Sequence, residues 1–352
     1  MTKDLLHGGA LDVVRAAFPD APEPWIDLST GINPWPYPDS HVSPEVLAHL
    51  PTQADQAACR AAMAAAIGAS PHSILLAPGS ELLIRLLPDC LPARRVAILS
   101  PTYGDHADAW ARSGTDIVRS EHPLEAAAEV DAVVVTHPNN PDGRRFDLEA
   151  LEQARRTLTA RGGYLIIDEA YADLHPEQSL ASHAGADGLI ILRSFGKFFG
   201  LAGVRLGATL APANVRERLA ARLGVWPVSG AALEIGTRAY ADTAWQTETR
   251  HRLAAAAARL DAVFSRAGLP PCGGTDLFRY IEVADAHEAF AHFARLGIYV
   301  RRFEWSKRHL RIGLPATQVA ETRLAEALNL LNGWASPRRQ TQPADTPPRR
   351  LD

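Results

Sequence analysis

One lysine in a glycine-rich, aromatic segment has the clearest chemical potential in this sequence. Lys197 stands in SFGKFFGLAGVRLG, directly after an apolar run, and it is one of only three lysines among 36 Lys and Arg residues. A lysine partly withdrawn from water is a good nucleophile and forms a Schiff base with an aldehyde, which arginine cannot do. Ser194 and Arg205 flank it and are suited to hold a phosphate. An isolated lysine in such a loop would otherwise be interpreted as a solvated charge.

Polar side chains follow three other apolar runs. Asp168 and Tyr171 lie in DEAY after YLII, Asn140 lies in HPNNPDG after AVVVT, and Tyr103 lies in SPTYGDH after VAIL. A pyridoxal phosphate enzyme needs a carboxylate to keep the pyridine nitrogen protonated, which fits Asp168, and donors to the ring's phenolic oxygen, which fit Tyr171 and Asn140. Tyr103 is suited to stack on a flat ring. The alternatives are a helix cap or an acidic metal ligand pair for DEAY, a simple turn for NNPDG, and an ordinary loop aromatic.

The segment Gly79-Ser80-Glu81 predicts the start of a helix, since apolar residues follow it at helical spacing. Backbone N–H groups at a helix N-terminus bind phosphate readily. Ser80 and Glu81 are therefore further candidates for a phosphate site.

The elements that must position these residues predict an α/β fold. Short apolar runs alternate with helical stretches, which is typical of a mostly parallel sheet covered on both faces. Ligands in such sheets bind beyond the carboxyl ends of the strands, where the polar clusters lie. The expected strands are 74–77, 96–99, 132–136, 164–167 and 189–192, and the expected helices are 53–67, 80–88, 104–113, 148–160, 211–223 and 237–267. A smaller α+β pattern follows, with strands at 277–283, 299–303 and 310–313 and helices at 286–296 and 317–332.

Taken together, the motifs resemble the fold-type I, pyridoxal-phosphate-dependent enzymes of the class I/II aminotransferase family, over residues 25–335. The resemblance implies that Lys197 forms the Schiff base, that Asp168 pairs with the pyridine nitrogen and that Tyr103 stacks on the ring. It also implies contacts of Asn140 and Tyr171 with the phenolic oxygen, a phosphate site at Ser80, Glu81, Ser194 and Arg205, and substrate binding by Arg311 in HLRIGLP and Arg301 in YVRRF. A homodimer is expected, because active sites of that fold type lie at a subunit interface.

The N-terminus narrows the resemblance to one group within that family. His7 begins an HGG motif, and Asn33 is the asparagine of a second motif, DLSTGINP. Both motifs resemble those of the threonine-phosphate decarboxylases of cobalamin biosynthesis. This similarity implies decarboxylation of L-threonine O-3-phosphate to (R)-1-amino-2-propanol O-2-phosphate, with His7 and Asn33 as candidate substrate contacts. The alternative is a histidinol-phosphate-type aminotransferase. In those relatives a tyrosine after the Asn-Pro pair reaches the partner's cofactor phosphate, whereas this sequence has Trp35 and Tyr37 there.

Composition bounds the remaining possibilities. The 352 residues carry a formal net charge of -4, which argues against a nucleic-acid partner, and the three cysteines are widely spaced, which fits a reducing, cytoplasmic setting. No metal site, signal peptide or membrane span is expected. The predicted organisation is an N-terminal arm (1–40) packing with the small domain, a large cofactor-binding domain (41–225), a small C-terminal domain (226–335) and a disordered, proline-rich tail (336–352).

Overall fold

A seven-stranded sheet forms the centre of the larger lobe in a computed structural model, which describes residues 8–331. The strand order is β2-β8-β7-β6-β5-β3-β4, and only β8 runs against its neighbours. The strands are β2 (Ile74–Ala77), β3 (Arg95–Leu99), β4 (Asp116–Ser120), β5 (Ala132–Thr136), β6 (Tyr164–Asp168), β7 (Leu189–Ser194) and β8 (Gly207–Leu210). The expected α/β class with a mostly parallel sheet is confirmed.

Helices cover both faces of this sheet because its central strands are apolar on both sides. Along β5, Val133 and Val135 pack into one hydrophobic cluster while Val134 packs into the other, as the two-residue side-chain period of a strand requires. The helices of this lobe are α2 (Pro44–Ala48), α3 (Gln53–Ile67), α4 (Ser80–Cys90), α5 (Gly104–Arg112), α6 (Leu148–Thr159), α7 (Phe195–Phe198), α8 (Ala213–Leu223) and α9 (Gly230–Ala241).

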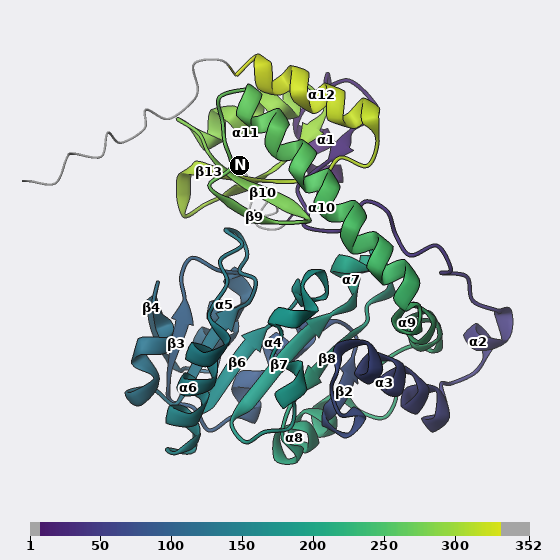
Figure 1. Cartoon of the computed structure of the whole chain (residues 1–352), viewed down its shortest axis with the longest axis vertical. Helices are drawn as coiled ribbons and strands as arrows, with labels where there is room; N and C mark the ends of the chain where they lie inside the picture. Colours follow the sequence, from purple (N-terminus) through teal and green to yellow (C-terminus); the bar gives the residue numbers. More distant parts are fainter. Residues whose placement is uncertain (1–7, 332–352) are drawn as a thin grey trace, which may run out of the picture.

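A smaller lobe lies across the end of the large sheet (Figure 1). Its four-stranded antiparallel sheet has the order β12-β13-β10-β9, and a separate parallel pair joins β1 of the N-terminal segment to β11. The strands are β1 (Ile26–Asp27), β9 (Gly273–Thr275), β10 (Phe278–Glu282), β11 (Ile298–Tyr299), β12 (Arg301–Phe303) and β13 (Ser306–Gly313), and the helices are α1 (Leu11–Ala17), α10 (Thr243–Arg266), α11 (Ala286–Arg295) and α12 (Gln318–Asn329). Helix α10 runs from this lobe towards α9 of the larger one (Figure 1).

Two predicted elements are divided in the structure. The single helix expected over 237–267 is two helices, because the Asp242 side chain accepts a hydrogen bond from the Trp245 N–H and so caps a new helix, α10. The single strand expected over 299–303 is split at Val300, since β11 pairs with β1 whereas β12 pairs with β13. Strands β1, β4, β8 and β9 were not predicted.

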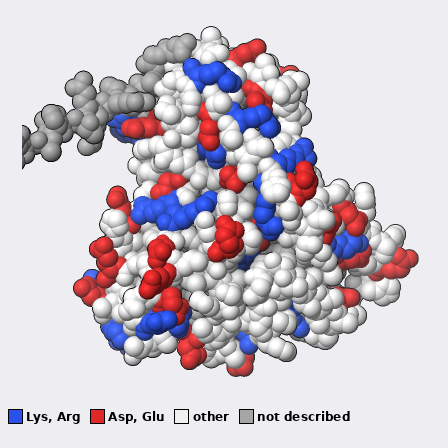
Figure 2. Space-filling view, viewed as in Figure 1, with Lys and Arg blue, Asp and Glu red and all other residues white. Residues whose placement is uncertain are grey.

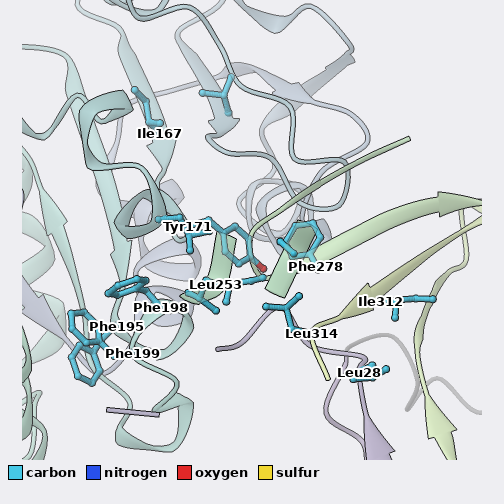
Figure 3. Close-up of a cluster of buried hydrophobic side chains, with 14 of the residues drawn as sticks. Leu28, Ile167, Tyr171, Phe195, Phe198, Phe199, Leu253, Phe278, Ile312 and Leu314 are labelled. Atoms are coloured by element: carbon cyan, nitrogen blue, oxygen red, sulfur yellow. The ribbon is translucent and has the colours of Figure 1, made fainter. Parts of the chain in front are cut away.

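Apolar side chains from both lobes form one continuous core cluster. Figure 3 shows Tyr171 pointing towards Phe278, with Leu314 beside them and the Phe195, Phe198 and Phe199 rings further into the larger lobe. The Tyr171 and Phe278 rings meet edge to face with centroids 5.3 Å apart. The two lobes are therefore held together by apolar packing directly beside the segment that carries Lys197.

The predicted domain boundaries stay a prediction. Helix α9 packs against α3 of the larger lobe although it follows residue 225. The predicted disordered tail, 336–352, lies outside the described residues. Within residues 8–331, none of the helices combines the length and the apolar character that crossing a membrane requires.

Candidate active site

The polar residues expected to act together line two connected cavities at the carboxyl ends of β5, β6 and β7. The inner cavity, of about 230 Å³, is lined by Ser80, Glu81, Ile84, Tyr103, Thr136, Asn140, Asp168, Ala170, Tyr171, Ser194, Lys197 and Arg205. An outer cavity of about 600 Å³ shares Tyr103, Asn140, Tyr171 and Lys197 with it and extends to Arg301 and Arg311. The structure thus gathers eleven of the thirteen residues predicted for the site.

Lys197 is held by the short helix α7 and by the N-terminal segment. Phe195 and Phe198 on either side of it are fully buried, so the backbone of α7 is fixed by the core. The Lys197 carbonyl accepts a hydrogen bond of 3.0 Å from the backbone N–H of Asn33. Gly196 packs so tightly that an added Cβ would lie 2.8 Å from the Ala202 Cα. The Lys197 side chain lines both cavities, and the backbone that carries it is held in place by these contacts.

Asp168 presents a buried carboxylate at the end of β6. One oxygen accepts the Ala170 N–H at 3.1 Å, and the other lies 3.0 Å from Nε2 of His106, a residue of α5 that is itself buried. A buried carboxylate needs such partners or a cation. Because Asp168 also lines the inner cavity, it fits the protonated nitrogen of a pyridine ring there. His106 was not predicted as a site residue. The one sequence feature that could have indicated it is its position three residues after Tyr103, on the same loop and helix start.

A phosphate cradle lies at the N-terminus of α4. Gly79 precedes this helix with a φ of 91° and supplies no capping side chain, so the first N–H groups of α4 remain available for an anion. Ser80, Ser194 and Arg205 line the same cavity. Arg205 has a φ of 55°, the one positive value among the described non-glycine residues. A Cβ on Gly79 would lie 2.7 Å from the Arg205 guanidinium, so close approach requires glycine there. These groups fit a phosphate ester.

Glu81 lines the same inner cavity as Ser80, Ser194 and Arg205. Its carboxylate accepts a hydrogen bond of 3.0 Å from the Tyr103 hydroxyl and lies 2.6 Å from Nε of Arg85. A carboxylate repels a phosphate, so the backbone of Glu81 suits the phosphate cradle better than its side chain does. The phosphate contact of Glu81 stays a prediction.

Arg311 links the small lobe to the inner cavity. Its guanidinium donates to the Asn140 side-chain oxygen at 2.6 Å and to the Ser29 carbonyl at 2.8 Å, and it lies over the Phe278 ring. The Arg311 Nε is buried and has no hydrogen-bond partner among residues 8–331. Burial, together with the charge of Arg311, lowers the pKa of neighbouring Arg301 to about 10, which still leaves Arg301 cationic near neutral pH. The buried Arg311 and the half-buried Arg301 beside it favour an anionic ligand.

Of the two substrate contacts predicted from the N-terminal motifs, only Asn33 lies among the described residues, and it lines neither cavity. Asn33 is buried, and its side-chain amide donates to the Phe198 carbonyl at 2.9 Å while its oxygen accepts from the Trp35 N–H. The Asn33 amide therefore braces the lysine segment, while its oxygen closes a local turn of the N-terminal segment. His7 lies outside the described residues, although the adjacent Gly8 lines the outer cavity.

A fully buried arginine supports the segment that carries Asp168 and Tyr171. Arg193 donates to Glu169 at 2.8 Å and also forms an ion pair with Asp173. The two carboxylates raise the pKa of Arg193 above its ordinary value even though burial opposes the charge. Glu169 is also held by the Ser179 hydroxyl and the Leu180 N–H. Sequence reasoning missed this network, which fixes the loop after β6.

Replacing Arg193 by methionine is expected to lower the free energy of unfolding by about 3–5 kcal/mol, because two buried carboxylates lose their cation. Chemical denaturation measures the effect. The matched control is Arg156→Met, which removes an arginine that is 67% exposed and paired with Glu152; such surface pairs contribute only about 0–1 kcal/mol. Equal losses of unfolding free energy in the two variants would show that the buried network stabilises the fold no more than a surface ion pair does.

Comparison with known proteins agrees with this geometry. The family model described as aminotransferase class I and II matches residues 23–328. The chain is 39% identical to a threonine-phosphate decarboxylase from Pseudomonas aeruginosa, with 92% of this chain and 97% of that protein covered. It is 38% identical to a threonine-phosphate decarboxylase from a Sinorhizobium species, with 93% and 98% covered.

Among solved structures, the fold is similar to that of the histidinol-phosphate aminotransferase from Clostridium acetobutylicum, with a TM-score of 0.77 and 18% identity. The match covers 87% of this chain and 98% of that one. At this level of identity the likeness concerns the fold alone.

Proposed function

Because this chain belongs to the class I and II aminotransferase family of pyridoxal-phosphate-dependent enzymes, we infer that it decarboxylates L-threonine O-3-phosphate. The observation that carries the inference is the similarity of 38–39% to two threonine-phosphate decarboxylases over nearly the whole length of each chain. The product is (R)-1-amino-2-propanol O-2-phosphate, in cobalamin biosynthesis. The alternative, a histidinol-phosphate-type aminotransferase, is supported by more distant sequence matches, at 28–33% identity over 49–78% of this chain, and by fold likeness.

The charges around the outer cavity fit this substrate. Its walls include Arg119 from β4, Arg301 and Arg302 from β12 and Arg311 from β13. On the face shown in Figure 2, basic side chains lie on both lobes beside the line where the lobes meet, with acidic side chains among them. A substrate with both a carboxylate and a phosphate needs several such cations.

Pyridoxal phosphate, when bound, supplies an electron sink for the bond that breaks at the substrate's Cα. Lys197 would hold the cofactor's aldehyde, the α4 N-terminus with Ser80, Ser194 and Arg205 would hold its phosphate, and Asp168 would keep the proton on its ring nitrogen. Asn140 and Tyr171 would donate to the phenolic oxygen, and Tyr103 would stack on the ring.

The substrate's carboxylate is oriented by Arg311, with Arg301 beside it. The Cα–carboxylate bond breaks, CO₂ leaves, and the electron pair stays at Cα. A proton then returns to Cα, and the freed Lys197 side chain, as an ammonium group, is the donor we propose, since it lines the same cavity. A transaminase would break the Cα–H bond instead, so the orientation set by Arg311 and Arg301 decides the outcome.

The expected result of the decisive experiment is one CO₂ released for each L-threonine O-3-phosphate consumed, with no keto acid present. Radiolabelled carboxylate measures the gas, and mass spectrometry identifies aminopropanol phosphate. The parallel reaction supplies histidinol phosphate and a keto acid. Turnover that needs the keto acid and releases no CO₂ would refute the decarboxylase and establish the aminotransferase.

We also propose that the enzyme is a cytoplasmic homodimer. Exposed apolar residues gather beside α2 and before α9, namely Leu47, Leu50, Val225 and Trp226. Val46 of α2 contacts Gly230 of α9, so these residues belong to neighbouring segments of one surface. A second copy of the chain is the partner expected for such a patch. The described thiols, Cys59, Cys90 and Cys272, are all free, which supports a reducing compartment.

A further inference from the structure

We propose that Glu81 is a positioning residue that fixes the plane of the Tyr103 ring, and thereby the space left for the cofactor. The proposal rests on the proposed function only in taking Tyr103 as the residue that covers the cofactor ring. It does not require that the reaction be a decarboxylation.

The Tyr103 hydroxyl is tethered at the end of the ring farthest from the backbone. Tyr103 is the residue that precedes α5, and its hydroxyl donates to the Glu81 carboxylate in the first turn of α4. The edge of the ring meets His106, the partner of Asp168, with centroids 6.2 Å apart and planes at 86°. The ring is therefore constrained at its hydroxyl and along one side, which leaves it little freedom to rotate.

The Glu81 carboxylate is itself fixed by opposite charge. Its second oxygen lies 2.6 Å from Nε of Arg85, one helical turn along α4, and the Arg85 guanidinium reaches the Asp105 carboxylate at 3.7 Å. These ion pairs connect α4 to α5. Helix α4 begins at Ser80, and α5 begins directly after Tyr103. A negative side chain in the first turn of α4 is also favoured by the helix dipole.

The Tyr103 hydroxyl stays protonated and so remains a donor. Burial raises the pKa of Tyr103, and the neighbouring Asp105 and Glu81 carboxylates raise it further. A phenol that donates to a carboxylate forms a charge-assisted hydrogen bond, which is stronger than a neutral one. Glu81 consequently holds the ring plane at any pH at which the fold persists and this carboxylate is ionised.

Four variants test the proposal by titrating the apo-protein with pyridoxal phosphate and recording the visible circular dichroism of the bound cofactor. Tyr103→Phe is expected to weaken cofactor binding about tenfold and to reduce the dichroic band, since it removes the hydroxyl that donates. Glu81→Ala is expected to weaken binding several-fold and to reduce the band in the same way, because Asp105 still faces the Tyr103 hydroxyl and keeps part of the tether. The double variant Tyr103→Phe/Glu81→Ala is expected to be no weaker than Tyr103→Phe alone. Glu81→Gln, whose amide oxygen still accepts from the hydroxyl, is expected to recover most of the affinity and the band.

The matched control is Glu149→Ala, which removes an exposed acidic residue from the first turn of α6 with no aromatic partner among the described contacts. It should leave cofactor binding unchanged. The proposal is overturned if Glu81→Ala binds the cofactor like the wild type, or if the two single effects multiply in the double variant. Failure of the wild-type chain to bind pyridoxal phosphate would overturn the proposed function itself, whereas binding without decarboxylation would overturn only the assigned reaction.

Discussion

Replacing Lys197 by alanine is expected to lower decarboxylation roughly 10⁴-fold or more. Among residues 8–331, Lys197 is the only imine-forming amine that lines the cavities, and the proposed proton donor at Cα is lost with it. The protein should keep its fold, since the Lys197 side chain is not part of the core and the flanking Phe195 and Phe198 remain. The visible absorbance of the bound cofactor's Schiff base should disappear. Initial rates and an absorbance spectrum of the purified variant measure both effects.

The control for this experiment is Lys307→Ala, the other lysine within residues 8–331, which is exposed on β13. That variant should retain wild-type rates and the wild-type spectrum. Lys197→Ala protein that still shows the absorbance band and turns over substrate would exclude Lys197 as the Schiff-base residue. A loss of the folded far-ultraviolet spectrum would instead show that Lys197 is needed for structure.

The sequence predicted those site residues that end buried strands. Asp168 and Asn140 each follow a short apolar run, and parallel strands bring such residues to one edge whatever the details of the loops. Lys197 was recognisable because arginine dominates the basic residues and cannot form an imine. Local pattern was sufficient in each case, since the strand and its polar end are adjacent in the chain.

Contacts between distant segments could not be predicted in this way. His106 reaches Asp168 across 62 residues, and Arg311 reaches Asn140 across 171. Nothing in the neighbouring sequence of either residue specifies its partner. The same limit explains Asn33, which sequence similarity associated with the substrate. Its side-chain amide instead donates to the Phe198 carbonyl, 165 residues away.

Two of the missed strands have a related cause. β4 lies at the edge of the sheet, and Asp116 and Arg119 are exposed, so its sequence lacks the apolar run that marked the central strands. β8 is buried but only four residues long, and it directly follows a glycine-rich segment. Tertiary pairing rather than local pattern determines both strands.

Changing Asp168 to asparagine is expected to reduce kcat about 10³-fold while the cofactor remains bound. Asparagine has nearly the same shape, so the buried site and the hydrogen bond from the Ala170 N–H can persist. It carries no charge, however, and cannot hold a proton on the pyridine nitrogen. The cofactor then withdraws electrons poorly as the bond at Cα breaks, which raises the barrier by about 4 kcal/mol at 1.36 kcal/mol for each factor of ten.

The companion variant His106→Gln separates charge from position. It keeps the Asp168 carboxyl group and removes only the imidazole contact of 3.0 Å, so a smaller loss of about tenfold is expected, in line with the loss of one hydrogen bond. Single-turnover measurements with saturating cofactor compare the two variants with the wild type. If Asp168→Asn kept more than a tenth of the wild-type kcat, the carboxylate's charge would not be what sustains the reaction. If His106→Gln were the slower variant, its imidazole rather than Asp168 would be the group that matters most at this end of the ring.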